Sequence, residues 1–277
     1  MSRIAQRFAE LKAQHRAAFV PFITAGDPDQ ETSRAILNAL PGAGADLIEL
    51  GMPFSDPMAD GPAVQASSQR ALKAGATMAR TLEIVRDFRT RDRKTPIVLM
   101  GYYNPIHAMG ADNFVKAVAA AGADGLIIVD LPPEEDAVLQ TPAKAAGIDV
   151  IRLVTPTTHE ARLAKVVIGA SGFLYYVSIA GVTGTKSFAE AEVKAALARI
   201  RKATDLPIAV GFGIRTPAQA GAIARFADAA VVGSAIVSAI GDHKGAPGKD
   251  NAVTKVTELC RALADSIHAV TGDKVGA

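Results

Sequence analysis

The chain has 277 residues, 49% of them hydrophobic, and its 30 basic and 28 acidic side chains leave a formal net charge of +2. This balance, without a basic block or aromatic residues interleaved with Lys and Arg, argues against nucleic-acid or membrane-surface binding. The one cysteine, Cys260, excludes an internal disulfide framework and a thiolate metal cluster.

The chain opens with an expected amphipathic helix, in which Ile4, Phe8 and Leu11 recur at helical spacing. Glu10 and the lack of a cleavage-like segment favour this reading over a transit peptide. The longest apolar run, 229–240, is shorter than the roughly 20 residues of a membrane-spanning helix. We therefore expect a soluble, cytoplasmic protein with no membrane partner.

Eight short apolar runs rich in Val, Ile and Leu follow, with helical patterns between them. We predict strands at residues 19–24, 47–50, 97–100, 125–129, 150–154, 173–177, 208–211 and 229–232. Continuous apolar runs of this kind are typical of parallel strands buried on both faces. A glycine that ends a helix leads into three of the strands through the segments 44–46, 122–124 and 147–149.

This alternation predicts an α/β fold, a (β/α)8 TIM barrel with an additional N-terminal helix and extra helices, as a single domain over residues 1–277. An open doubly wound sheet is the alternative. The extra helices are expected at 63–74 and 79–90, with a final helix at 252–269. The Gly- and Pro-rich segment 241–250 predicts a flexible surface loop of unassigned role.

In such barrels, catalytic groups lie at the carboxyl ends of the strands. Glu49 stands there in an apolar strand, and Asp60 lies in the loop that follows. An ionised carboxylate among Leu and Ile is costly unless it is paired or protonated. Arg152 is the only basic residue near a strand end, so we interpret Glu49 as functional. Two carboxylates in different settings commonly divide acid and base roles, although Asp60 could simply form a turn.

Glycines follow the sixth, seventh and eighth predicted strands, and Ser234 opens the helix after the eighth. Bare backbone N–H groups and a helix N-terminus can hold a phosphate dianion. Tight turns would explain one such glycine, but three at one end of a barrel favour phosphate binding. The predicted phosphate site comprises Gly184, Gly213, Gly233 and Ser234.

Other residues carry weaker indications. Tyr175 in the sixth strand could be core packing, and Asp130 could anchor a loop. No His, Asp and Glu set has metal-ligand spacing, so we predict no metal, and neither a nucleophile elbow nor a dinucleotide fingerprint is present. Apolar residues in the loops after the second, third and fourth strands could cover a substrate or contact a partner.

Five motifs, in this order, resemble the tryptophan synthase alpha subunit family: PFITAGDP (21–28), IELGMPFSDPMADGP (48–62), GYYNP (101–105), GVTG (181–184) and GFGI (211–214). The likeness runs from about residue 4 to residue 268. It implies a lyase of tryptophan biosynthesis that splits indole-3-glycerol phosphate into indole and glyceraldehyde 3-phosphate. A phosphate-sugar isomerase on the same type of barrel and a non-catalytic activator are the alternatives.

The resemblance also implies roles for individual residues. Glu49 would be the general acid and base, Asp60 would accept the indole N–H, and Tyr175 would position the substrate and Glu49. Substrate contacts would come from Phe22, Met100, Tyr102, Ile127, Thr183 and Phe212.

The family pairs with a beta subunit that carries pyridoxal phosphate. The resemblance therefore implies an alpha2beta2 heterotetramer and no cofactor in this chain. The interface would include Pro53, Phe54, Asp56, Pro57, Asn104 and Pro132.

Overall fold

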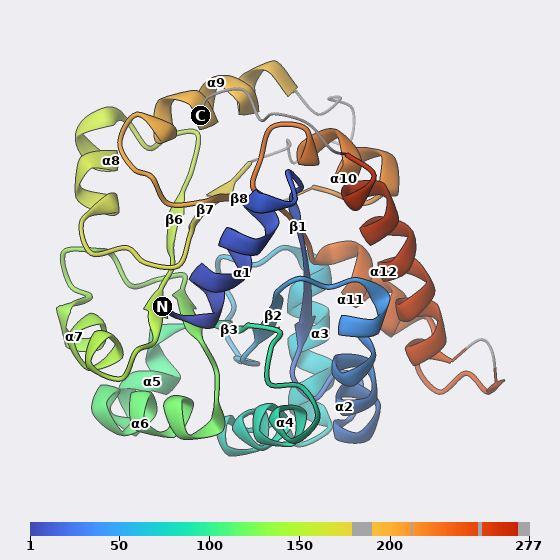
Figure 1. Ribbon diagram of the computed structural model, residues 1–277. Coiled ribbons are helices and arrows are strands. Elements are labelled where there is room, and N and C mark those ends of the chain that lie inside the picture. The colour runs from blue at the N-terminus through green and yellow to red at the C-terminus, as the bar shows by residue number, and fades with distance from the viewer. Residues whose placement is uncertain (179–189, 212, 249–250, 271–277) are drawn as a thin grey trace.

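The computed structural model describes residues 1–178, 190–211, 213–248 and 251–270. Within these ranges, nine parallel strands form one sheet in the order β5-β4-β3-β2-β1-β9-β8-β7-β6, with helices around it (Figure 1). The strands are β1 (Ala18–Thr24), β2 (Ile48–Gly51), β3 (Ile97–Gly101), β4 (Gly125–Ile128), β5 (Asp149–Val150), β6 (Arg152–Val154), β7 (Leu174–Val177), β8 (Ile208–Gly211) and β9 (Ala229–Val232).

The sheet closes through a single residue, Ile151. The fifth predicted strand, 150–154, divides there, because β5 pairs only with β4 and β6 pairs only with β7. The Ile151 N–H still donates to the Leu126 carbonyl of β4 at 2.9 Å. The predicted barrel is thus confirmed and the open doubly wound sheet is excluded, with nine strand segments at eight barrel positions.

Helices precede, connect and follow the strands. They are α1 (Arg3–Ala13), α2 (Gln30–Ala39), the short 3-10 helix η1 (Pro41–Ala43), α3 (Pro62–Lys73), α4 (Met78–Arg91), α5 (Tyr103–Met109), α6 (Ala111–Ala121), α7 (Ala137–Ala145), α8 (Glu160–Val167), α9 (Glu190–Arg201), α10 (Pro217–Ala224), α11 (Ser234–Asp242) and α12 (Ala252–His268). None of the helices in the described ranges has the length and apolar character needed to cross a membrane.

The three extra helices are confirmed as α3, α4 and α12, but the predicted loop 241–250 begins too early. Gly241 and Asp242 form the last turn of α11, because the buried face of that helix continues to Ile240. A Cβ on Gly241 would lie 2.9 Å from Arg70 Nη1, so glycine lets the arginine pack against the helix. Residues 249–250 lie outside the described ranges, and the single-domain expectation stays a prediction.

Side chains of each strand alternate between the barrel interior and the surrounding helices, as the pleat requires. The interior set comprises Ala18, Val20, Leu47, Val98, Ile127, Ile151, Phe173, Tyr175, Ala209, Ala229 and Val231. The outward set, which includes Phe19, Ile48 and Leu99, packs against the helices. The strands are thus buried on both faces, as their continuous apolar sequences predict.

Helix α1 covers the amino-terminal end of the barrel (Figure 1). Its buried residues Ile4, Phe8 and Leu11 join the interior cluster, and the Phe8 ring centroid lies 5.7 Å from that of Phe173. The predicted amphipathic helix is therefore confirmed, and the cluster that it joins reaches up the barrel to Tyr175 on β7.

Buried aspartates that lead into β2 and β4 attach α1 to the barrel. Asp46 accepts the Phe19 N–H at 2.8 Å and forms an ion pair with Arg7 of α1. Asp124 in turn binds Arg3 of α1 at 2.6 Å. The sequence pattern Gly-Ala-Asp thus ends a helix, as predicted, and also supplies the carboxylate that joins neighbouring elements.

Candidate active site

Glu49 lies in β2 and is buried, with 1% of its surface exposed. It stands in register with Phe22 of β1 and Val98 of β3. Its Oε1 atom has no hydrogen-bond partner among the described residues. Burial raises the pKa of Glu49 to about 8, because desolvation disfavours the ionised carboxylate. The side chain is therefore largely protonated at neutral pH and can both give and take a proton.

Arg152, the one basic residue predicted near a strand end, does not pair with Glu49. Its guanidinium lies 2.6 Å from Asp136 and also donates to the Val166 carbonyl at 3.0 Å, on the outer side of β6. This ion pair is structural, so the interpretation of Glu49 as an unpaired carboxylate agrees with the structure.

Tyr175 on β7 faces the same interior and is 7% exposed. Burial and then the charge of Glu49 raise the pKa of Tyr175 well above its ordinary value, which places the two side chains within electrostatic reach. The Tyr175 hydroxyl lies against the backbone of Gly211 on β8, where a Cβ would collide with it. Two of the three predicted catalytic residues are thus brought together inside the barrel.

Asp60 lies in the loop between β2 and α3, just before the first turn of α3. Burial raises the pKa of Asp60, and a hydrogen bond with Tyr102 opposes the rise. The Tyr102 hydroxyl also accepts the Ala59 N–H at 2.9 Å. The Gln65 amide donates to the Asp60 carbonyl at 2.8 Å. Tyr102 therefore fixes the segment of the loop that presents the Asp60 carboxylate.

A small cavity lies between the carboxyl ends of β1, β2 and β3 and the start of α3. Its walls comprise Phe22, Thr24, Gly51, Met52, Phe54, Asp60, Val64, Ser68, Met100, Gly101, Tyr102 and Val129. The walls are mostly apolar and carry one carboxylate, but the volume of about 10 Å3 is only that of a single water, so a larger ligand would have to widen the cavity. Three predicted substrate contacts line this cavity together with Asp60, namely Phe22, Met100 and Tyr102.

Ile127 occupies a different place from the other predicted substrate contacts. It is fully buried in the barrel interior, beside Met100 in the strand register, and does not line this cavity. Thr183 and Phe212 lie outside the described residues, as does Gly184 of the predicted phosphate site.

The cavity is also lined by residues that were not predicted as site residues from the sequence. Thr24, Met52 and Val129 each end or follow a strand at this end of the barrel, which is the position that could have indicated them. Gly51 has a steric role, since a Cβ there would lie 2.7 Å from Phe22 Cζ and displace the ring.

The described part of the predicted phosphate site lies after β8 and β9. Gly213 has a φ of +83°, a conformation that favours glycine. Gly233 and Ser234 form the N-terminus of α11, where no side chain of the described residues caps the helix. The free N–H groups of this first turn and the helix dipole suit a phosphate group.

The predicted interface residues surround the same end of the barrel. Asp56, Asn104 and Pro132 are exposed, whereas Pro53, Phe54 and Pro57 are partly buried. The Phe54 ring centroid lies 5.3 Å from that of Tyr102, so this part of the predicted interface contacts the cavity wall.

Two weaker indications also have a position in the structure. Asp130 accepts the Tyr103 N–H at 2.8 Å and so anchors the start of α5, in the segment where a loop was expected. No cluster of three His, Cys, Asp or Glu side chains in the described ranges could hold a metal ion, and the absence of a metal stays a prediction.

Comparison with known proteins agrees with this geometry. The sequence model of the family Tryptophan synthase alpha chain matches residues 8–268. The chain is 39% identical to tryptophan synthase subunit alpha from Legionella pneumophila str. Paris, covering 98% of this chain and 100% of that one with a TM-score of 0.91. A structure of tryptophan synthase from M. tuberculosis, an open form with BRD0059 bound, is 33% identical over 97% of this chain and 99% of that one, with a TM-score of 0.86.

An aminoacrylate-bound form of the M. tuberculosis enzyme is 32% identical, covering 96% of this chain and 100% of that one, with a TM-score of 0.85. The family match spans nearly the whole chain, and the similar structures share its barrel from end to end. The chain belongs to the tryptophan synthase alpha chain family.

Proposed function

We propose that the chain cleaves indole-3-glycerol phosphate to indole and glyceraldehyde 3-phosphate, with Glu49 as the proton-transferring group. The observation that carries this assignment is a buried, unpaired carboxyl with a pKa of about 8 at the open end of the barrel. A general acid or base works best when its pKa lies near the working pH. The lyase activity itself follows from membership of the family.

The reaction needs a proton at each end of the bond that breaks. Protonated Glu49 delivers its proton to the ring carbon that bears the glycerol chain, and the ring becomes cationic. The resulting Glu49 carboxylate then removes the hydroxyl proton of the adjacent chain carbon. The carbon–carbon bond breaks, its electron pair returns to the ring, and the aldehyde leaves. Glu49 ends the cycle protonated, as it began.

Asp60 has the complementary role of stabilising the cationic ring. Its carboxylate borders a mostly apolar cavity and is held by Tyr102, so it is oriented to accept the indole N–H once the ring widens the cavity. Phe22 and Met100 would contact the faces of the ring, and Tyr175 would orient the chain hydroxyl toward Glu49.

The phosphate would bind at the backbone N–H groups of Gly213, Gly233 and Ser234, with Gly184 from the loop after β7. Thr183 and Phe212 remain substrate contacts in this proposal, and Ile127 would support the cavity from within the barrel. Anchoring the substrate at its phosphate would fix the distance of the scissile bond from Glu49.

Release of indole by the purified chain tests this assignment. We expect indole from indole-3-glycerol phosphate with the wild type and a large loss with Glu49→Gln. A phosphate-sugar isomerase would instead yield a rearranged sugar phosphate and no indole. A non-catalytic activator would stimulate the partner equally well with either variant.

For the partner, we propose a beta subunit that carries pyridoxal phosphate, in an alpha2beta2 assembly, with no cofactor in this chain. The exposed Asp56, Asn104 and Pro132 at the mouth of the barrel support such an interface. A cytoplasmic location accords with this biosynthetic role.

Native mass spectrometry of the chain mixed with a beta subunit tests the assembly. Two copies of each chain are expected, and Asp56→Ala together with Asn104→Ala should weaken the complex. A mass with one alpha chain per beta dimer would contradict the stoichiometry.

A further inference from the structure

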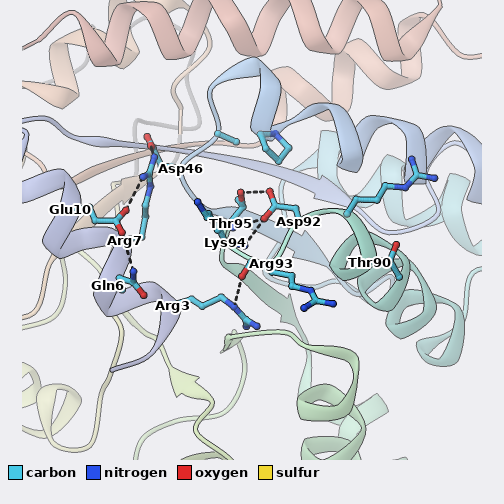
Figure 2. A pocket seen from close by; sticks show the side chains of 13 residues that line it. Arg3, Gln6, Arg7, Glu10, Asp46, Thr90, Asp92, Arg93, Lys94 and Thr95 are labelled. Carbon is cyan, nitrogen blue, oxygen red and sulfur yellow. Dashed lines mark hydrogen bonds and ion pairs between the residues drawn. The ribbon is translucent and has the colours of Figure 1, made fainter.

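A second concave site lies at the amino-terminal end of the barrel, opposite the catalytic end. It is a pocket of about 830 Å3 between α1 and the loop that joins α4 to β3 (Figure 2). Arg3 and Arg7 of α1 form one side, and Arg91, Arg93 and Lys94 form the other. We call it the basic pocket.

The charges in the basic pocket do not cancel. Its five cations face three carboxylates, those of Glu10, Asp46 and Asp92, which leaves an excess of two positive charges. Asp46 is already shared between Arg7 and Arg16, and it also lies 2.9 Å from His268 Nε2.

The two remaining carboxylates are occupied as well. Glu10 is bound to Arg7 at 3.1 Å. Asp92 accepts hydrogen bonds from the backbone N–H groups of Lys94, at 2.7 Å, and Thr95, at 2.8 Å. Glu10 and Asp46 are thus paired with arginines outside the loop, and Asp92 alone offsets the charge of the three loop cations.

The side chains of Arg91, Arg93 and Lys94 have no such partner. Within the described part of the chain, none of the three donates a side-chain hydrogen bond or forms an ion pair, and all three are exposed. Residues 91–94 carry three cations against the one carboxylate of Asp92, so an added anion would relieve the remaining repulsion.

The backbone of the pocket is nonetheless fixed. Arg3 Nε donates to the Arg93 carbonyl at 2.9 Å, which ties α1 to the loop across the pocket. Arg3 also binds Asp124 at 2.6 Å. In Figure 2 the labelled Arg3 and Arg93 meet at one end of the pocket, and Lys94 lies nearer to Arg7. Ordered walls that carry free cationic side chains are suited to bind a ligand with little loss of backbone entropy.

We propose that the basic pocket binds a short polyphosphate chain, either free or as part of a nucleotide. Guanidinium groups match phosphate oxygens bidentately and lysine adds a point charge, so Arg91, Arg93 and Lys94 could neutralise several phosphate charges at once. A volume of about 830 Å3 exceeds the need of a single phosphate and suits a ligand of several such groups. This site does not depend on the proposed catalytic roles, because it lies at the other end of the strands.

Calorimetric titration of the full chain with inorganic tripolyphosphate, at constant ionic strength, tests the proposal. Arg93→Ala combined with Lys94→Ala should weaken binding about tenfold or more, since both changes remove charge-assisted phosphate contacts. The matched control is Lys116→Ala with Lys202→Ala, which removes two exposed cations from α6 and the end of α9. The control should bind as the wild type does. No binding by the wild type, or equal weakening by both pairs, would overturn the site.

The catalytic phosphate site could also take up this anion, so a third variant separates the two. Ser234→Asp places a carboxylate at the N-terminus of α11 and should leave tripolyphosphate binding in the basic pocket unchanged. The proposal would be contradicted if Ser234→Asp abolished binding while the Arg93→Ala and Lys94→Ala pair bound as tightly as the wild type. Titration with adenosine triphosphate distinguishes the sources, since tighter binding than tripolyphosphate identifies a nucleotide and equal binding identifies the phosphate chain alone.

Discussion

The hydroxyl of Tyr175 lies where a Cβ on Gly211 would stand, so the side chain of one strand occupies space that a glycine on the next leaves open. This close approach places Tyr175 across the interior, within electrostatic reach of Glu49. The position of a proposed catalytic aromatic residue therefore depends on a glycine that bears no functional group of its own.

Substitution of that glycine tests the dependence. Gly211→Ala should displace Tyr175 and lower kcat for indole release by about tenfold or more, because misplaced catalytic groups lose reactivity steeply. Gly42→Ala is the matched control, since a Cβ there has no heavy atom within 4 Å. A Gly211→Ala variant with wild-type kcat would show that the Tyr175 position is not needed.

Removal of the titrating group at position 49 should abolish proton transfer while keeping the shape of the side chain. We expect Glu49→Gln to lower kcat by about 10²-fold or more. In the wild type, the pH dependence of kcat/KM should include a group with a pKa of about 8, and this transition should be absent from the residual activity of the variant. An unchanged profile would assign that pKa to another residue.

Glu49 should also make stability depend on pH. Its pKa rises from 4.5 to about 8 on folding, so the folded state keeps a proton that the unfolded chain releases above pH 4.5. The stabilising contribution is complete below pH 4.5 and is lost as the pH rises to 8. Glu49→Gln has no titrating group at this position, so its stability lacks this pH dependence.

Between pH 5 and pH 8, the free energy of unfolding of the wild type should therefore fall by about 2–4 kcal/mol relative to that of Glu49→Gln. Urea denaturation at both pH values measures this difference. Parallel curves for the two proteins would mean that Glu49 is hydrated in the folded state.

Tyr102→Phe should affect Asp60 while preserving the aromatic contact with Phe54. The variant loses the hydrogen bond that opposes the rise of the Asp60 pKa, so the acid limb of kcat/KM should move to higher pH. It also leaves the Ala59 N–H without its acceptor, at a cost of about 1 kcal/mol of stability. Tyr103→Phe removes the neighbouring phenol outside the cavity and serves as the control. An equal shift in both variants would refute a specific link from Tyr102 to Asp60.

Much of the barrel could be predicted because its information is local. Apolar runs separated by helical patterns indicate strands buried on both faces, and Glu49 is conspicuous as an acid within such a run. The division of the fifth strand could not be predicted, because it depends on whether β4 or β7 supplies the partner. Both strands are distant in sequence from Ile151, and the residues next to Ile151 do not indicate which of the two is the partner.

The attachment of α1 escaped prediction for a similar reason. Arg3 and Asp124 lie 121 residues apart in the chain, and each alone has the appearance of an ordinary surface charge. Tyr102 was expected to contact the substrate, whereas its hydrogen bonds to the Asp60 loop emerge only when β3 and that loop are placed side by side. Pairwise contacts between distant segments are thus the part that a single sequence does not reveal.

The closure of the sheet at Ile151 makes this point of the chain intolerant of length changes. The alternation of side chains continues through Ile151 from β5 into β6, so Arg152 faces outward and Leu153 faces inward. One inserted residue would exchange the two faces of β6, so the Arg152 guanidinium would point into the barrel interior that contains Glu49 and Tyr175. Natural insertions should therefore accumulate elsewhere in the chain and spare this junction.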